Sequence, residues 1–351
     1  MNGSKLGDKR IHAIILAILA AVFYAVNVPV SKLLLANVPP KLMAAFLYLG
    51  AGAGIGILSL FNKEDREKSE RLAKTDLPYV IGMIVLDIAA PIFLMLGIRL
   101  GSAANASLLG NFEIVATTVI ALALFREAVS KRLWLAILLI TASSIILSFD
   151  GTDGLRFSTG SLFVLGATLC WGLENNCTRK ISDKSTYEIV VLKGFFSGAG
   201  SLIIALASGE KLPAIQYIGI ALVLGFVAYG LSIFLYVRAQ NTLGAAKTSA
   251  FYAAAPFVGS LLAFVFLREK LTANYLVALA VMIGGTALVV ADTLIRTHTH
   301  EHTHTCTHSH NGVIHTHEIR HSHPHNHYAP GENHTHHHSG KELAHEHGVT
   351  V

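Results

Sequence analysis

Long apolar runs alternate with short polar segments between residues 11 and 292 of this 351-residue chain. A helix needs roughly 20 apolar residues to cross the hydrocarbon core of a bilayer, and ten runs approach that length. The expected spans are residues 11–35, 41–61, 78–98, 103–125, 132–149, 159–179, 187–207, 215–237, 243–267 and 272–292. Several runs are short or contain polar residues, which is typical of helices that line a cavity. The pattern predicts an all-α membrane protein with ten transmembrane helices.

The polar dipeptide Arg-Glu occurs twice along the chain, 142 positions apart. Arg126-Glu127 and Arg268-Glu269 each close one apolar run and precede another. The first run of each half also matches, with an offset of 147: Tyr24, Asn27 and Lys32 correspond to Trp171, Glu174 and Arg179. These matches predict two five-helix repeats, at residues 1–149 and 159–292. Because five is an odd number, the second repeat enters the membrane from the opposite face, and we expect the repeats to be inverted.

The distribution of Lys and Arg orients this bundle. With the N-terminus in the cytoplasm, sixteen of these residues fall on the cytoplasmic side and seven on the other. Cytoplasmic loops carry the excess of positive charge in membrane proteins. We therefore expect both termini in the cytoplasm and the chain in the plasma membrane. The formal net charge of +5 reflects this orientation and does not indicate nucleic-acid binding.

The matched residues resemble those of a known family. The first helix of each repeat contains an aromatic residue followed by a small one, Tyr24-Ala25 and Trp171-Gly172, and an acidic residue precedes each fifth helix. These features resemble those of the drug/metabolite transporter superfamily. The EamA type is the nearest in pattern, over about residues 11–292. The resemblance implies a transporter of amino acids or other metabolites, usually an exporter, although some members import and distant branches exchange nucleotide-sugars. This chain departs from the pattern at Tyr24, where Trp is usual, and at Ile114, which corresponds to Pro256.

Four ionisable residues lie deep in the expected spans: Asp87, Glu113, Glu174 and Lys193. Ionisable groups are costly in hydrocarbon, so they normally face the bundle interior and mark functional sites. A carboxylate there could bind a cationic group, or take up and release a proton as its exposure alternates. The structural alternative is a buried ion pair, for instance between Glu174 and Lys193.

Five further residues are candidates for a substrate site. Asn27 corresponds to Glu174 in the repeat, and Asn175 follows Glu174 directly; their amides could orient a substrate or simply bond a neighbouring helix. Tyr24, Trp171 and Tyr252 could line a cavity, or else pack in the core. Glycines spaced by four residues, such as Gly52 and Gly56 in the second helix, favour close helix contact.

The sequence indicates no enzyme. It contains no phosphate-binding loop of the form G-x-x-x-x-G-K-[ST], so transport would draw on a gradient. No cofactor is required by this scheme. The expected partners are the bilayer and a small-molecule substrate, and the sequence leaves a homodimer open.

The composition changes abruptly after Asp292. Eighteen of the 19 histidines follow it, and the polar residues around them cannot bury a core, so residues 293–351 are predicted to form a disordered cytoplasmic tail. Histidine has a pKa of about 6.5, so most of these imidazoles are neutral in the cytosol and free to bind Ni, Zn, Co or Cu. The expected metal ligands are His298, His300, His302, His304, His308, His310, His315, His317, His321, His323, His325, His327, His334, His336, His337 and His338.

Three functions are therefore compared. In the first, the bundle carries an organic metabolite and the tail regulates or is incidental. In the second, the bundle exports a divalent transition metal or its complex, and in the third it anchors a metal sensor. The first is favoured, because His12 is the only histidine outside the tail and a sensor does not need inverted halves.

Overall fold

The computed structural model describes residues 2–61, 71–125, 130–150, 156–181, 184–243, 248, 251–294, 296–310 and 313–327. For residues 296–310 and 313–327 only the backbone is described. The first of the two Arg-Glu dipeptides, Arg126-Glu127, lies outside the described residues. So do four of the expected metal ligands, His334, His336, His337 and His338. Residues Met1–Asp292 form one unit and Thr293–Val351 a second.

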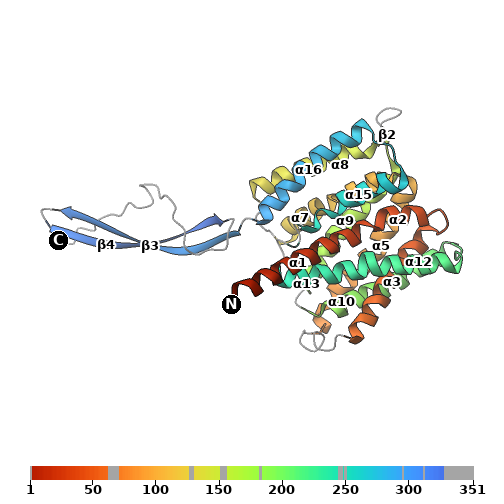
Figure 1. Ribbon diagram of the computed structural model, residues 1–351, viewed down its shortest axis with the longest axis horizontal. Helices are drawn as coiled ribbons and strands as arrows, with labels where there is room; N and C mark the ends of the chain where they lie inside the picture. The colour runs from red at the N-terminus through yellow and green to blue at the C-terminus, as the bar shows by residue number, and fades with distance from the viewer. Residues whose placement is uncertain are drawn as a thin grey trace. The chain divides into compact units, whose positions relative to one another are not determined.

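The first unit is a bundle of helices (Figure 1). Its helices are α1 (Asn2–Ala25), α2 (Asn27–Leu34), α3 (Pro40–Phe61), α5 (Leu77–Leu100), α6 (Ala103–Leu109), α7 (Phe112–Phe125), α8 (Lys131–Ser148), α9 (Thr159–Arg179), α10 (Thr186–Leu192), α11 (Gly198–Ala207), α12 (Ile215–Gly225), α13 (Ser232–Leu243), α15 (Ala255–Leu267) and α16 (Ala273–Leu294). A two-residue antiparallel pair, β1 (Phe149–Asp150) with β2 (Arg156–Phe157), lies between α8 and α9.

Eight stretches of the described residues are long and apolar enough to cross a membrane. They coincide with eight of the ten expected spans. The other two expected spans correspond to α9, which is 21 residues long but carries Glu174 and two asparagines, and to the 13-residue α15. Polar residues weaken the apolar character of α9, and residues 244–247 and 249–250 of the expected span that contains α15 lie outside the described residues.

Several of these helices are interrupted in their middle. The chain turns at Val26 between α1 and α2, and at Gly110-Asn111 between α6 and α7. Two π-helical segments, Lys193–Ser197 and Phe226–Leu231, join α10 to α11 and α12 to α13. Pro256 occupies the first turn of α15, where its missing N–H costs nothing. Pro91, in contrast, lies inside the continuous helix α5.

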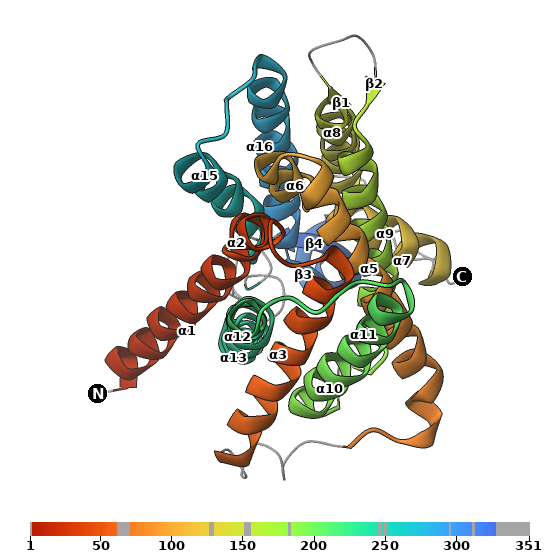
Figure 2. The same ribbon diagram turned by 90° about the vertical axis from the view of Figure 1, so that its right-hand side faces the viewer.

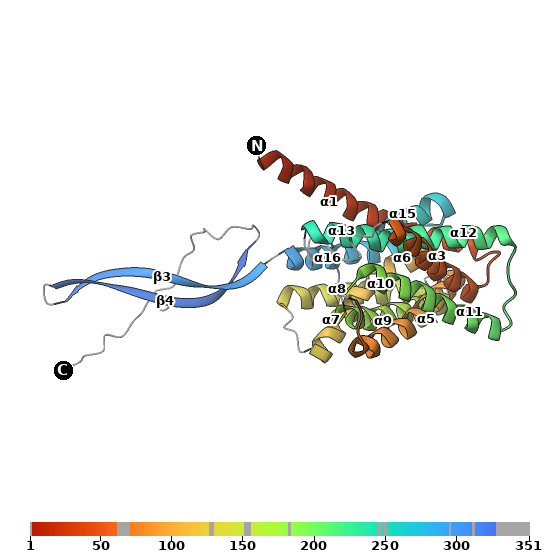
Figure 3. The same cartoon turned by 90° about the horizontal axis from the view of Figure 1, so that it is seen from below.

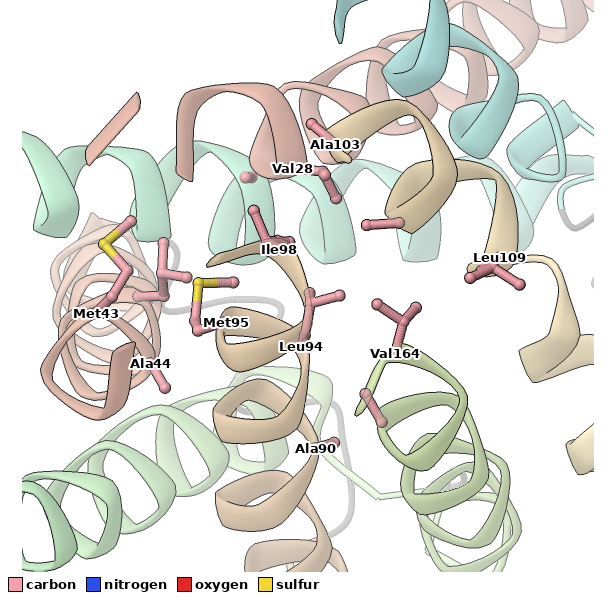
Figure 4. Close-up of a cluster of buried hydrophobic side chains, with 14 of the residues drawn as sticks. Val28, Met43, Ala44, Ala90, Leu94, Met95, Ile98, Ala103, Leu109 and Val164 are labelled. Carbon is pink, nitrogen blue, oxygen red and sulfur yellow. The ribbon is translucent and has the colours of Figure 1, made fainter. Parts of the chain in front are cut away.

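Helix α3 packs between two partners from the second half of the chain, α11 and α12 (Figure 2). Glycines allow this approach: a Cβ atom on Gly52 would lie 2.9 Å from the backbone nitrogen of Phe195, which follows Gly194. Helix α5 likewise packs along α9. The main hydrophobic core, which includes Met43, Met95 and Val164, fills the space where α3, α5 and α9 approach α2 and α6 (Figure 4).

The second unit contains two antiparallel strands, β3 (Arg296–His310) and β4 (Val313–His327) (Figure 3). This differs from the predicted disorder of the tail over these two ranges. Thr alternates with His along much of β3, and period-two alternation with a β-branched residue suits a strand. The register places His298 opposite His325 and His308 opposite His315.

Candidate functional site

The site is built around one buried ammonium group. The Nζ atom of Lys193 lies 2.8 Å from Oε1 of Glu174 and 3.1 Å from Oδ2 of Asp87. Lys193 begins the π-helical segment after α10, Glu174 belongs to α9 and Asp87 to α5. The side chain of Lys193 is 14% exposed, whereas Glu174 and Asp87 are 3% and 1% exposed. Three elements distant in sequence therefore bring their charges together inside the bundle.

Hydroxyl groups add one hydrogen bond to each of the two carboxylates, while Oδ2 of Asp87 has only the ion-pair contact with Lys193. Tyr48 of α3 donates a hydrogen bond of 2.8 Å to Oδ1 of Asp87. Thr178, one turn after Glu174 in α9, donates to Oε1 of Glu174. Buried charges persist only when paired and hydrogen-bonded in this way. The group of two carboxylates and one ammonium carries one formal negative charge in excess, which a cationic group or a proton would neutralise.

A second polar contact links α7 to α9. The Nδ2 atom of Asn175 donates to Oε1 of Glu113 at 2.7 Å and to the Thr117 hydroxyl at 3.2 Å. Asn176 donates to the carbonyl oxygens of Gly172 and Thr117. Because Glu174 and Asn175 are consecutive, α9 connects the Glu113 contact with the Lys193 group.

Asn27 makes the third polar contact. Its Nδ2 atom donates to the hydroxyl of Tyr229 at 3.2 Å, and its Oδ1 atom accepts from Ser31 at 3.1 Å. The Ser31–Asn27 bond joins residues four positions apart, as the Thr178–Glu174 bond does. The 147-residue offset relates Asn27 to Glu174 and Ser31 to Thr178. The two matched positions thus keep the same local bond with an amide in one half and a carboxylate in the other.

These residues lie at irregular points of their helices. Lys193 and Tyr229 belong to the two π-helical segments, Asn27 follows the turn at Val26, and Glu113 lies in the first turn of α7. π-Helical segments inside α-helices occur frequently at functional sites, and irregular backbone at membrane depth is tolerated where it lines a cavity or is buried in protein. The local backbone therefore supports a functional role for this region.

A row of tyrosines extends from the Lys193 group. Ring centroids are 5.3 Å apart for Tyr48 and Tyr229, 6.1 Å for Tyr229 and Tyr24, and 5.6 Å for Tyr24 and Tyr252. Tyr252 also contacts Tyr236 at 5.2 Å. Such spacings are those of interacting aromatic pairs. The rings are tilted or edge-on to one another, with interplanar angles from 38° to 76°, and each ring carries a hydroxyl group.

The structure brings most of the sequence-derived candidates into this region. Asp87, Glu174 and Lys193 form one group, Glu113 bonds Asn175, and Tyr24 contacts Tyr252. Trp171 is buried in α9, one turn before Asn175. The ion pair between Glu174 and Lys193 that the structural alternative requires is present, and Lys193 contacts Asp87 as well.

Three contributors were missed from the sequence: Tyr48, Thr117 and Tyr229. A tyrosine or threonine in an apolar run does not stand out as an ionisable residue does. The available signal was the position of Tyr48, close to the middle of its span and directly before the glycines of α3. Asn111, at the turn between α6 and α7, is also buried, and neither atom of its amide has a hydrogen-bond partner.

Within the described residues, no group of three or more His, Cys, Asp or Glu could hold a metal ion. The side chains of the tail histidines from His298 to His327 are not among those that the structure describes. Their role as metal ligands stays a prediction.

A helical bundle with eight stretches that are long and apolar enough to cross a membrane, two matched halves and a buried charged group contributed by both halves is an arrangement typical of membrane transporters. The chain belongs to the EamA-like transporter family, whose model matches residues 11–149 and 158–291. The family resemblance read from the sequence is confirmed.

Curated relatives have the same character. An uncharacterized transporter of Methanothermobacter thermautotrophicus is 25% identical over 297 residues, covering 79% of this chain and 85% of the relative. The uncharacterized transporter YyaM of Bacillus subtilis is 22% identical over 265 residues, covering 73% and 86%. A solved crystal structure aligns with a TM-score of 0.60 at 16% identity, over 80% of this chain and 97% of its own. That likeness supports the fold.

Proposed function

We propose that this protein is a gradient-driven exporter of a small organic metabolite, such as an amino acid, that works by alternating access. The observation that carries this proposal is the composition of the site. Asp87 and Tyr48 come from the first family-matched segment, whereas Glu174 and Lys193 come from the second. The Asn27–Tyr229 and Glu113–Asn175 bonds also join the two segments. Motion of one half against the other would remake these contacts.

The chemistry of the site favours a substrate with an amino group. A substrate ammonium could replace Lys193 at one of the carboxylates, and a substrate carboxylate could then pair with the released Lys193. The tyrosine row and the Asn27 amide would contact the apolar and polar parts of the same molecule. A zwitterion therefore suits the site better than a simple anion, because the site carries a net negative charge.

Glu113 is the proposed proton carrier. Its carboxylate accepts a hydrogen bond from the neutral amide of Asn175 and forms no ion pair with a basic residue in the described part of the chain, whereas Glu174 is held by Lys193. A carboxylate that is held only by neutral donors can change its charge without leaving a buried ammonium uncompensated. Exchange of the substrate against protons would then drive export.

The proposed topology has ten transmembrane helices in two inverted repeats, with both termini in the cytoplasm of a plasma-membrane protein. Helices α9 and α15 supply the two spans beyond the eight. The charge distribution and the odd number of spans per repeat support this arrangement. A homodimer is compatible with it.

We also propose that the histidine tail binds Ni, Zn, Co or Cu and regulates transport. The register of β3 and β4 places Cys306 opposite His317 and His300 opposite His323, which would bring ligand-bearing residues of both strands to one face of the ribbon. The alternative functions, export of a divalent transition metal by the bundle and a membrane-anchored metal sensor, place the metal at the centre of function.

Uptake into everted membrane vesicles separates these proposals. Vesicles with and without the protein would be given a mixed metabolite pool, or Ni²⁺, Co²⁺ and Zn²⁺, in the presence and absence of a proton gradient. Uptake of an organic compound that depends on the gradient supports the main proposal. Uptake of a metal ion alone supports metal export, and no uptake of either supports the sensor.

A further inference from the structure

Glu269 connects the two halves of the bundle at one end. It follows α15, and its Oε2 atom accepts hydrogen bonds from the Ser102 hydroxyl at 2.8 Å and from the backbone nitrogen of Ala104 at 2.9 Å. Its Oε1 atom accepts from the backbone nitrogen of Ala103 at 2.8 Å. A single carboxylate from the second half therefore satisfies the first N–H groups of helix α6 in the first half, where the helix dipole also favours a negative charge.

The backbone before Glu269 is held in an unusual conformation. Arg268 has φ of 51°, and it is the only residue other than glycine with positive φ in the described part of the chain. Side chains with a Cβ atom rarely adopt this left-handed conformation, and it persists where the surroundings hold it. The turn directs the chain from the end of α15 towards α6, so the strain and the three hydrogen bonds belong to the same contact.

Neighbouring contacts close the same end of the bundle. The Nζ atom of Lys32 in α2 donates to the carbonyl oxygens of Ile98 and Gly101 at 2.6 Å each, which fixes α2 to the end of α5. Deeper in the bundle, a Cβ atom on Gly259 of α15 would lie 3.0 Å from the Ala25 carbonyl oxygen and 3.1 Å from the Ser107 hydroxyl. Helix α15 thus lies directly against α6 and the first helix of the other half.

We propose that Glu269 is a latch that holds this end of the transport pathway closed and must release α6 for this end to open. The inference rests on the proposed function, in which the halves move against each other. Release is reversible because α6 keeps its own cap: the Ser102 hydroxyl also accepts from the backbone nitrogen of Asn105 at 3.1 Å. When Glu269 moves away, water at this end of the bundle can accept hydrogen bonds from the backbone N–H groups of Ala103 and Ala104.

A second carboxylate at the same end provides a matched control. Glu210 accepts hydrogen bonds from the backbone nitrogens of Lys41 and Leu42 at the start of α3, at 3.4 Å and 2.9 Å. It also joins the two halves, but it lies at the end of the glycine-lined contact between α3 and α11, where a Cβ atom on Gly198 would meet the side chain and the backbone nitrogen of Leu49. Glu210 contacts the start of α3 and not α6, so its substitution should leave the contact between α15 and α6 unchanged.

Cysteine accessibility tests the proposal without a known substrate. Cys170, Cys177 and Cys306 would be replaced by alanine in the full-length protein, and Ser107→Cys would be introduced, because Ser107 is 4% exposed and faces Gly259. The labelling rate with a maleimide would be measured in detergent. Glu269→Gln is expected to raise that rate several-fold, Glu269→Asp to raise it less, and Glu210→Gln to leave it unchanged.

Two results would overturn the proposal: an unchanged labelling rate in folded Glu269→Gln and Glu269→Asp proteins, or an equal increase in Glu210→Gln. If Glu269→Gln does not fold, Glu269→Asp decides, since it keeps the charge and shortens the reach by one methylene. Because labelling requires no substrate, failure of the latch is distinguishable from failure of the transport assay.

Discussion

The ammonium of Lys193 lies 2.8 Å from Oε1 of Glu174, and the same nitrogen lies 3.1 Å from Asp87. One positive charge therefore holds two carboxylates that come from different halves of the bundle. Removing the positive charge leaves two acidic groups close together without compensation. Removing one negative charge leaves a neutral pair. The two kinds of substitution should have different effects on stability.

Lys193→Met should destabilise the protein strongly, since breaking a buried ion pair by removing one partner costs on the order of 3–5 kcal/mol. Thermal unfolding in detergent would show this as a lower Tm. The triple variant Lys193→Met, Glu174→Gln, Asp87→Asn removes all the charges and should recover most of the Tm without recovering transport. An equally low Tm for the triple variant would contradict a charge effect and indicate lost packing.

Glu174→Gln should fold normally and abolish transport. The glutamine can still accept from Thr178 and Lys193, so the hydrogen bonds survive, while the negative charge that attracts a substrate ammonium is lost. Vesicle uptake and Tm would be measured side by side. Glu188→Gln is the control: Glu188 accepts from the backbone nitrogen of Leu72, away from the Lys193 group, and its substitution should leave transport intact.

Glu113→Gln should abolish gradient-driven transport with little loss of stability. Glutamine keeps the acceptor for Asn175 but cannot carry a proton. If Glu113 serves proton coupling, substrate exchange across vesicles without a gradient should continue in this variant. Loss of exchange as well would assign Glu113 to substrate binding, and unchanged uphill transport would reduce it to a structural role.

Gly52→Ala should destabilise the contact between α3 and the π-helical segment Lys193–Ser197. The added Cβ atom would lie 2.9 Å from the Phe195 nitrogen and 3.0 Å from the Gly194 Cα atom, both backbone atoms that cannot rotate away. Overpacking typically costs about 1–3 kcal/mol, which should lower the Tm. Gly219→Ala is the matched control, because no atom lies within 4 Å of its added methyl group and alanine favours the helix. A similar fall in both variants would refute the packing argument.

The apolar runs predicted the helical architecture because the bilayer imposes a length and a composition on each span. The repeated Arg-Glu dipeptide and the offset of 147 residues between matching positions indicated the family. Ionisable residues within the runs led to Asp87, Glu113, Glu174 and Lys193, since burying such groups needs a compensating partner. Periodicity and burial cost act locally, so the sequence expresses them directly.

Contacts between side chains that are far apart in the sequence were harder to predict. The sequence offered Glu174 with Lys193 as one alternative among several, but it gave no reason to join Tyr48 to Asp87 or Asn27 to Tyr229. Those contacts depend on how helices cross, and on π-helical segments whose positions no local pattern marked. In the tail, low apolar content predicts disorder whereas the period-two alternation of Thr and His is typical of a strand, so the two local patterns lead to different predictions.

Removal of residues 298–351 should leave basal transport in everted vesicles unchanged, because the site lies wholly within residues 1–292. The same truncation should abolish the binding of Ni²⁺ or Zn²⁺ by the purified protein, measured by calorimetry. If the tail regulates, adding the metal should change the transport rate of the full-length chain and have no effect on the truncated one. Loss of all transport on truncation, together with loss of metal export, would instead make the metal the substrate. The glutamate variants separate these outcomes further: Glu174→Gln should stop transport while the tail still binds metal with unchanged affinity.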